Sequence, residues 1–351
     1  MSSATEAKRP LSPTASRGGL SSWARRNALQ IGIVLVALFI WVLFLIGAPK
    51  TFMSFNIYNA FLITTPYFAM VAIPLTLVII TAEIDLSFGS IMAWGMTGFD
   101  VVYAGIQIPT PFGFIGFAGT QNFWVSFVAC LLFGVFAGLI NGLIVVKIGV
   151  PSLVATIGTQ FFWAGMVILV TNAQGMGLTF LQDSLLHVGL VGRIGGLIPM
   201  QFIWMIVFAL GVWFLLNRTQ FGAHVYLTGD NMESARLMGV DVDRVKIVCF
   251  ALVGLAAAFA GFVQSADLLF FWPTMGQGNF LNTLAAVFLG GTSVFGGAGT
   301  VFGTFVAAFI INAINPGIVA VGLTQYYTQV IYGFIIVVSV ALQAGLRKRL
   351  T

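Results

Sequence analysis

The sequence predicts an all-α polytopic membrane protein whose chain crosses the bilayer about ten times, with eight crossings as the lower count. Hydrophobic residues make up 59% of the 351 residues and charged residues only 7%, whereas a soluble domain usually carries about 25% charged residues. Several apolar runs exceed the roughly 18 residues that indicate a membrane-spanning helix. Because these runs are continuous rather than alternating, a transmembrane β-barrel is disfavoured.

The apolar runs define the expected spans in chain order. These spans are residues 28–48, 57–80, 88–107, 123–146, 153–172, 200–216, 246–266, 280–293, 298–316 and 326–345. The run at 280–293 would be only about 21 Å long as a helix, which is short for a hydrocarbon core of about 30 Å. We therefore expect a Gly-interrupted, broken helix there. If this run forms a re-entrant hairpin with 298–316, the number of spans is eight.

Basic residues cluster at both ends of the chain. The tail 1–27 is expected to be disordered, and the tail 347–351 reads RKRLT from Arg347. Since loops rich in Lys and Arg stay on the cytoplasmic side, we expect both tails to be cytoplasmic, with the membrane domain at 28–346 between them. Both clusters border apolar spans, so we attribute them to membrane topology and expect no nucleic-acid partner.

Two segments rich in glycine and polar residues interrupt the apolar pattern, TAEIDLSFGS at 81–90 and LGGTSVFGGAG at 289–299. Paired interruptions in opposite halves of a transporter point to its transport site. Within the first segment, Glu83 and Asp85 have two interpretations. They line a pathway, as ionisable groups inside a membrane often do, or they cap the helix that begins near Ser87.

One long charged stretch, residues 217–246, interrupts the apolar chain and carries eight of its 25 charged side chains. The spacing of Asp230 and Glu233 predicts a capping box at the start of a helix over about 231–238. Gly239 is expected to adopt the left-handed conformation after this helix, and Asp241 to cap the next one. A helix this short is marginal alone, so we expect it to dock against a partner in water.

Motifs for enzymatic chemistry do not emerge from the sequence. Its two cysteines lie inside apolar runs, its two histidines are isolated, and no metal-ligand spacing or Ser/His/Asp pattern is visible. The sequence contains no Gly-Lys pair and hence no GxxxxGK[ST] phosphate loop. We therefore expect no enzyme, no metal site and no cofactor. A proton-driven secondary transporter with Glu83 and Asp85 as its relay remains an alternative.

Four motifs resemble one known family, the ribose-type permease subunits of bacterial ABC importers. The motifs are AEIDLSFGS at 82–90, GLINGLIVVKIGVPSLVATIGT at 138–159, FGAHVYLTGDNMESARLMGVDVDRVKI at 221–247 and LAAVFLGGTSVFGGAGTVFGT at 284–304. The resemblance covers about residues 57–340, with the motifs in the family's order. One departure is Ala82-Glu83-Ile84-Asp85, where the family often reads Gly-Gly-Ile-Asp.

This resemblance implies a multi-pass permease of the bacterial inner membrane with several partners. They are cytoplasmic ATPase subunits that bind the ATP, a second permease subunit (an identical copy or a paralogue) and a periplasmic substrate-binding protein. The stretch 217–246 would be the coupling loop. The residues expected to dock into the ATPase are Asp230, Glu233, Ser234, Ala235, Arg236, Leu237 and Gly239.

The expected cargo is a monosaccharide or a polyol, because the spans offer mostly neutral hydrogen-bonding groups. Relatives that carry nucleosides or branched-chain amino acids keep those solutes open as alternatives. The residues expected along the translocation pathway are Glu83, Asp85, Ser87, Asn141, Gln160, Trp272, Asn282, Thr292 and Ser293.

Overall fold

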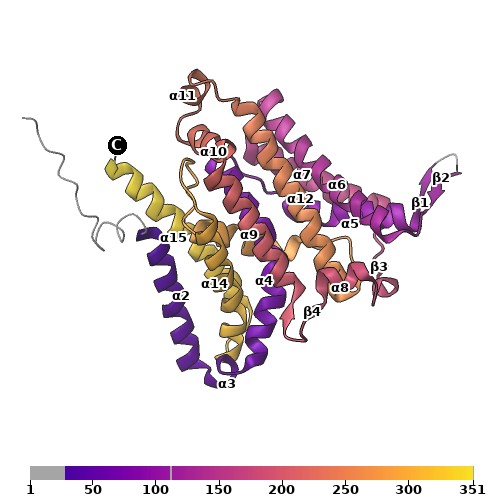
Figure 1. Ribbon diagram of the computed structural model, residues 1–351, viewed down its shortest axis with the longest axis horizontal. Coiled ribbons are helices and arrows are strands. Elements are labelled where there is room, and N and C mark those ends of the chain that lie inside the picture. The colour runs from indigo at the N-terminus through magenta and orange to yellow at the C-terminus, as the bar shows by residue number, and fades with distance from the viewer. Residues whose placement is uncertain (1–27, 111–112, 351) are drawn as a thin grey trace, which may run out of the picture.

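The computed structural model describes residues 28–110 and 113–350, and within them the chain is almost entirely helical (Figure 1). The all-α polytopic fold that the sequence predicts is confirmed. The predicted tail 1–27 lies outside the described residues. The last helix continues through the predicted C-terminal tail as far as Leu350.

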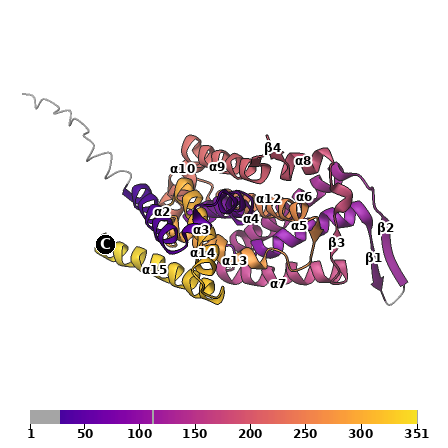
Figure 2. The same cartoon turned by 90° about the horizontal axis from the view of Figure 1, so that it is seen from below.

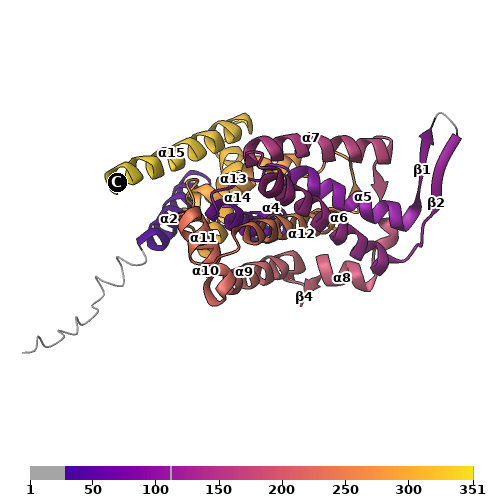
Figure 3. The same cartoon turned by 90° about the horizontal axis from the view of Figure 1, so that it is seen from above.

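Eight helices of the described chain are long and apolar enough to cross a membrane. They are α2 (Ala28–Gly47), α4 (Phe55–Ile80), α6 (Phe123–Leu143, continued by the π-helical turn η1 at Ile144–Ile148), α7 (Ser152–Thr171), α9 (Met200–Arg218), α12 (Val242–Leu268), α14 (Val301–Ala320) and α15 (Tyr326–Leu350). Figures 2 and 3 show α4 and α12 in the middle of the molecule, between a layer with α8 and α9 and a layer with α7, α13 and α15.

Two shorter helices complete the ten predicted passes. α5 (Phe88–Ala104) has 17 residues and α13 (Phe280–Leu289) has 10, which correspond to about 25 Å and about 15 Å of helix. Both are shorter than a hydrocarbon core of about 30 Å. Backbone that is not α-helical precedes each of them, at 81–87 and at 269–279. The eight spans expected from the sequence leave out 280–293 and 298–316 as a hairpin, whereas the eight long helices of the structure include α14 and leave out α5 and α13.

The two short helices start against each other in the interior. A Cβ on Gly276 would collide with the carbonyl oxygen of Gly89. The rings of Phe88 and Phe280, the first residues of α5 and α13, stack with centroids 5.5 Å apart and planes 13° apart. Irregular backbone at membrane depth is tolerated only where protein encloses it or a cavity receives it. The mutual contact of the two helix starts provides part of this enclosure.

Glycines also allow α6 and α12 to pack closely. Gly134, Gly138 and Gly142 are spaced four residues apart on α6, and a Cβ on any of them would clash with the backbone of α12. Gly254 of α12 faces Gly134 in the same way. Such a small-xxx-small seam is how membrane helices approach without a hydrophobic driving force between them. The glycines of the GLING motif thus have a packing role.

Short elements cover the two ends of the helices. One end carries α10 (Gln220–Asp230) and α11 (Met232–Leu237), together with the segment 290–299. The other end carries α3 (Pro49–Phe52), η2 (Thr179–Leu181) and α8 (Leu185–Val191), and the short strand pairs β1–β2 (Gly105–Thr110, Gly113–Ala118), β3–β6 (Met176–Gly177, Phe270–Phe271) and β4–β5 (Arg193–Ile194, Ile198–Pro199). The predicted span 88–107 therefore ends at Ala104, where the β1–β2 hairpin begins. The short turn η3 (Gln277–Asn279) lies in the interior, against the start of α5.

Both described chain ends belong to the side that carries α11. Gln343, near the end of α15, bonds through Nε2 to the carbonyl oxygen of Thr292 at 3.0 Å. At the opposite side, the Phe44 ring near the end of α2 occupies the space that a Cβ on Gly317 would need. The start of α2 therefore lies toward α11. A chain that crosses the membrane an even number of times has both its ends on the same side.

The contact between the two short helices leads to a prediction about Gly276. Gly276→Ala should lower the thermal-unfolding midpoint of the detergent-purified protein, because Gly276 has a φ of +86° and no room for a methyl group. A left-handed conformation alone costs a non-glycine residue about 1–2 kcal/mol. Gly278→Ala is the matched control, since nothing lies within 4 Å of its added Cβ. Equal midpoints for the two variants would contradict the proposed enclosure.

Candidate functional site

The charged stretch 217–246 folds into two helices rather than one. The first, α10, begins after Thr219, whose Oγ1 accepts a hydrogen bond from the N–H of Gly222 at 3.3 Å. The sequence analysis did not predict this helix. It runs to Asp230 and packs beside α9 and α12, and α11 follows it directly (Figure 1).

The predicted capping box of α11 is wrong. Asp230 is the last residue of α10, and Asn231 is the N-cap, with its Oδ1 accepting the N–H of Ser234 at 2.9 Å. Glu233 therefore occupies the second helical position, not the third. The reason is that α10 takes up Asp230, and the turn between the helices falls at Asn231, whose backbone is extended.

Two other local predictions for this stretch are confirmed. Gly239 has a φ of +82°, in the left-handed region that favours glycine. Oδ1 of Asp241 accepts the N–H of Arg244 at 3.0 Å and so caps α12. The left-handed Gly239 thus follows the end of α11, and the side chain of Asp241 caps the start of α12.

The residues expected to dock into a partner lie mostly on an open surface of α11. Ala235 is fully buried and holds the helix to the protein, whereas Glu233, Ser234, Arg236 and Gly239 are exposed. Leu237 is 89% exposed and the adjacent Met238 is 61% exposed. Two large apolar side chains projecting from a charged surface are typical of a protein contact site.

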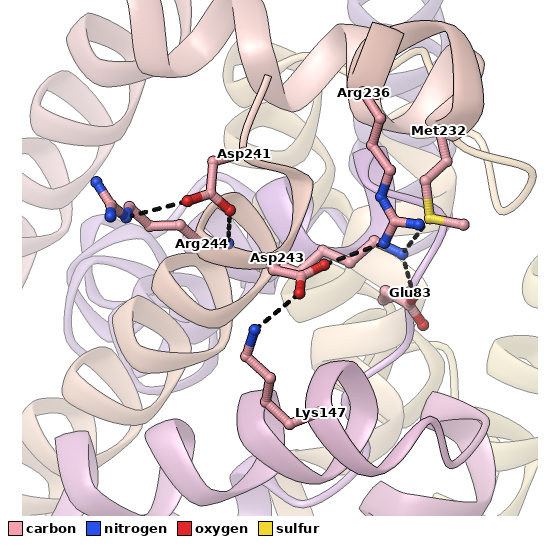
Figure 4. Close-up of polar contacts among 8 residues, drawn as sticks. Glu83, Lys147, Met232, Arg236, Asp241, Asp243 and Arg244 are labelled. Carbon is pink, nitrogen blue, oxygen red and sulfur yellow. Dashed lines mark hydrogen bonds and ion pairs between the residues drawn. The ribbon is translucent and has the colours of Figure 1, made fainter. Parts of the chain in front are cut away.

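Ion pairs fasten α11 to the spanning helices. Arg236 lies 3.0 Å from Oδ1 of Asp243 on α12, and Lys147 at the end of α6 lies 2.9 Å from Oδ2 of the same carboxylate (Figure 4). Both oxygens of Asp243 are therefore used. The three side chains connect α11, α12 and α6 through a single carboxylate.

Glu83 forms a second, more enclosed ion pair next to α11. Its Oε1 lies 2.6 Å from Nζ of Lys246 on α12, and the side chains are only 14% and 11% exposed. Nζ of Lys246 also lies 3.5 Å from Sδ of Met232 on α11. Removing one partner of a short, enclosed ion pair strongly destabilises a protein. The sequence analysis singled out Glu83 but missed Lys246, whose only signal was its position just inside the start of a span.

Asp85, Ser87 and Asn141 are brought together in the interior. Oδ1 of Asp85 accepts hydrogen bonds from the N–H and the Oγ–H of Ser87, at 2.9 and 2.6 Å. Nδ2 of Asn141 donates to Oγ of Ser87 at 2.6 Å. The bond to the N–H of Ser87 forms a local turn just before α5, and no side chain caps the first turn of this helix. This carboxyl is fully buried in the link between α4 and α5.

The remaining predicted pathway residues are distributed over four places. Thr292 is buried and Ser293 half-buried in the segment 290–299, and Asn282 lines a cavity at the opposite end of the helices. Gln160 is half-buried on α7, and Trp272 packs against the core after β6. The structure therefore does not gather the nine residues into one site.

The segment 290–299 connects α10 to the end of α4. The N–H of Gly297 donates to the carbonyl oxygen of Ile80 at 2.9 Å, and Tyr226 of α10 donates through its hydroxyl to the carbonyl oxygen of Gly299 at 2.9 Å. A Cβ on Gly229 would collide with the same carbonyl of Ile80. Both sequence breaks thus meet under the helices of the charged stretch. The glycines of 290–299 could have indicated a close approach of another backbone segment, but not that the segment is the end of α4.

Within the described residues, no three His, Cys, Asp or Glu side chains gather in a way that could hold a metal ion. The chemistry of the α11 end is instead that of paired charges and an exposed apolar face. Such a surface can bind a partner and transmit its movement, because it is fastened to α6, α12 and the link before α5.

The enclosed ion pair leads to a prediction about stability. Lys246→Met should lower the free energy of unfolding by about 3 kcal/mol, because it leaves the carboxylate of Glu83 enclosed without its partner. Arg244→Met is the control, since its pair with Asp241 is 81% and 57% exposed and such pairs contribute below about 1 kcal/mol. Thermal unfolding of the purified variants measures both. Adding Glu83→Gln to Lys246→Met should restore part of the loss, and no restoration would contradict the pairing.

Comparisons with known proteins identify the family. Residues 57–340 match the family described as "Branched-chain amino acid transport system / permease component". The ribose import permease protein RbsC of Escherichia coli (strain K12) is 33% identical over 295 residues, covering 84% of this chain and 87% of that protein. The autoinducer 2 import system permease protein LsrC of Photorhabdus luminescens is 34% identical over 278 residues, covering 79% and 78%.

A second LsrC protein, from Yersinia pseudotuberculosis serotype O:3 (strain YPIII), is 30% identical over 287 residues and covers 82% of this chain and 77% of its own length. No solved structure gives a significant match. Because the family match extends over most of the chain and the relatives align over most of their length, this protein belongs to the family of ABC importer permease components, which are membrane transport subunits and not enzymes.

Proposed function

We propose that this protein moves a monosaccharide or a polyol through the bacterial inner membrane, in a complex powered by cytoplasmic ATPase subunits that dock on α11. The observation that carries the proposal is the exposed face of Leu237, at the end of α11, and of the adjacent Met238, on a segment that the Arg236–Asp243 ion pair fastens to α12. The sequence has no phosphate loop of its own, so the ATP would be bound by the partner.

The distribution of basic residues supports a cytoplasmic location of α11. Lys147, Arg218, Arg236, Arg244 and Lys246 belong to its end of the protein, whereas only Lys50 and Arg193 among the described residues belong to the other end. Loops rich in Lys and Arg stay on the cytoplasmic side. In this orientation both chain ends are cytoplasmic, and the end that carries α8 and the hairpins faces the periplasm.

The contacts of α11 suggest how an ATPase movement would reach the membrane. A displacement of α11 would be transmitted to α12 and α6 through Arg236, Asp243 and Lys147. α10 would transmit it to α4 and to the segment 290–299 through Gly229 and Tyr226. These contacts are short and close-packed, so the groups they connect move together.

The printed names of the relatives support a sugar-like cargo. RbsC is named a ribose import permease and LsrC an autoinducer 2 import permease. In addition, the polar side chains within the spans of this chain are mostly neutral amides and hydroxyls, which suit a neutral polyhydroxy solute. A branched-chain amino acid is the second candidate, because the description of the matching family names it.

Two further partners belong to the proposal. A periplasmic binding protein would deliver the solute to the end opposite α11. A second permease subunit, identical or paralogous, would pack against this chain to enclose the pathway. The exposed residues of α15, among them Val330, Phe334 and Val337, lie on the same layer as α7 (Figures 2 and 3) and would be available to it.

The docking proposal predicts the effect of a charge on α11. Leu237→Asp should weaken the association with the ATPase subunits by more than about 2 kcal/mol, or about thirtyfold, as for a central contact residue. Leu185→Asp is the matched control, because Leu185 is 82% exposed at the opposite end. Co-purification of the tagged permease with its ATPase measures both. Undiminished association of the Leu237 variant, at equal membrane abundance, would rule out docking at α11.

The proposed energy source and cargo can be tested by reconstitution. Proteoliposomes with the permease, its ATPase and its binding protein should accumulate labelled ribose or ribitol only when ATP is supplied to the α11 side. Vesicles with the permease alone and an imposed proton gradient should accumulate neither solute. Uptake by the permease alone would favour a proton-driven transporter, and uptake of leucine in preference to both solutes would favour the amino acid.

A further inference from the structure

A polar cavity lies between the starts of α13 and α15, toward the end of the helices opposite α11. Its volume is about 380 Å³, which is within the range of about 300–1,000 Å³ for small-molecule sites. Residues from three segments line it, at 277–282, at Asn315 of α14 and at 325–332. These segments are far apart in the sequence and meet only in the folded chain.

The chemistry of this cavity differs from that of three other cavities. Its lining includes the amides of Gln277, Asn282, Asn315, Gln325 and Gln329 and the hydroxyl of Thr328, and no charged side chain. The cavities between α2 and α14 and between α9 and α14 have apolar and aromatic linings, as expected for lipid-facing grooves. The cavity beside α11 contains several charged side chains, among them those of the Glu83–Lys246 pair.

Two hydrogen bonds hold one wall of the cavity in place. Oγ1 of Thr328 donates to Oδ1 of Asn315 at 3.1 Å, and the hydroxyl of Tyr332 donates to the carbonyl oxygen of Ile311 at 3.0 Å. Both bonds join α15 to α14. Thr328 and Tyr332 are buried and fix the spacing of these helices. The side chain of Gln329, which lies between them in the sequence, remains exposed.

The amides on the other walls keep their hydrogen-bonding groups available. Within the described chain, the side chains of Gln277, Asn282, Gln325 and Gln329 form no hydrogen bond with the protein. Each amide offers two donors and an acceptor. Such groups in a membrane domain are costly unless they meet water or a polar solute. Hydroxyl groups both donate and accept, so they match a lining of amides.

We propose that this cavity is a binding site for a neutral polyhydroxy solute on its way through the membrane, with Asn282 and Gln329 as direct contacts. The inference rests on the proposed function and adds the residues that select the solute there. The lining offers no charge to balance a carboxylate or an ammonium group, which disfavours an amino acid in this cavity. Weak neutral contacts also suit a site that the solute must leave again.

Site-specific labelling tests this proposal in the intact complex. Cys130 and Cys249 are fully buried, so a thiol introduced by Gln329→Cys would be the accessible one among the described residues for a membrane-impermeant maleimide. Ribose or ribitol should slow the labelling in proportion to occupancy, by about fourfold at three times Kd. Gln182→Cys is the control, because Gln182 is exposed at the same end but outside the cavity. Its labelling should not change.

A second variant tests the role of the amide itself. Adding Asn282→Leu to Gln329→Cys should raise the ribitol concentration for half-maximal protection by about fivefold, the expected effect of one lost hydrogen bond. Leucine at the same concentrations should protect neither thiol. Unchanged protection by ribitol after Asn282→Leu, or equal protection by leucine, would overturn the proposal.

Uptake by the same proteoliposomes separates this proposal from the proposed function. If ribose or ribitol is imported with ATP but never protects the thiol at position 329, the cavity is not part of its path and the import function still holds. If neither is imported, the proposed cargo is wrong. If the thiol is unreactive without solute, or cross-links to a second permease subunit, that subunit fills the cavity and the site proposal fails.

Discussion

The absence of water in the hydrocarbon core is the constraint on which this structure depends, because every backbone N–H and C=O there must find a partner inside the protein. The chain breaks its helices at 81–87 and at 269–279, where this requirement is hardest to meet. Packing encloses the breaks, and side chains supply hydrogen-bond partners to part of the backbone at the first of them. Gly89 and Gly276 touch, Phe88 stacks on Phe280, and the side chain of Asp85 accepts the backbone N–H of Ser87.

The first of these breaks, at 81–87, is connected to the charged end of the protein. Glu83, within the first break, pairs with Lys246 in the first turns of α12, and Lys246 also contacts Met232 of α11 (Figure 4). The carbonyl of Ile80, just before this break, receives the N–H of Gly297 and abuts Gly229 of α10. A force on α10 or α11 therefore acts directly on irregular backbone, which deforms more readily than a continuous helix because fewer local hydrogen bonds maintain it.

Charged and neutral polar groups are separated along the helices. The ion pairs belong to the α11 end, where water and a protein partner can balance them. The polar cavity near the opposite end has neutral amides and hydroxyls and no charged side chain in its lining. This separation fits a protein that receives mechanical work at one end and a neutral solute at the other.

The sequence by itself determined the membrane class, the order of the spans, the short helix that begins at residue 280 and the local signals at Gly239 and Asp241, because apolar length, glycine and capping residues act within a few positions. The four motifs were enough to recognise the family. Only the tertiary structure decided that Asn231 rather than Asp230 caps α11, that Glu83 pairs with Lys246, and that Asn282 meets Asn315 and Gln329 around one cavity. The physical reason is distance along the chain. The extra helix α10 shifted the cap, and the partners of Glu83 and Asn282 are brought close only when helices distant in sequence pack together.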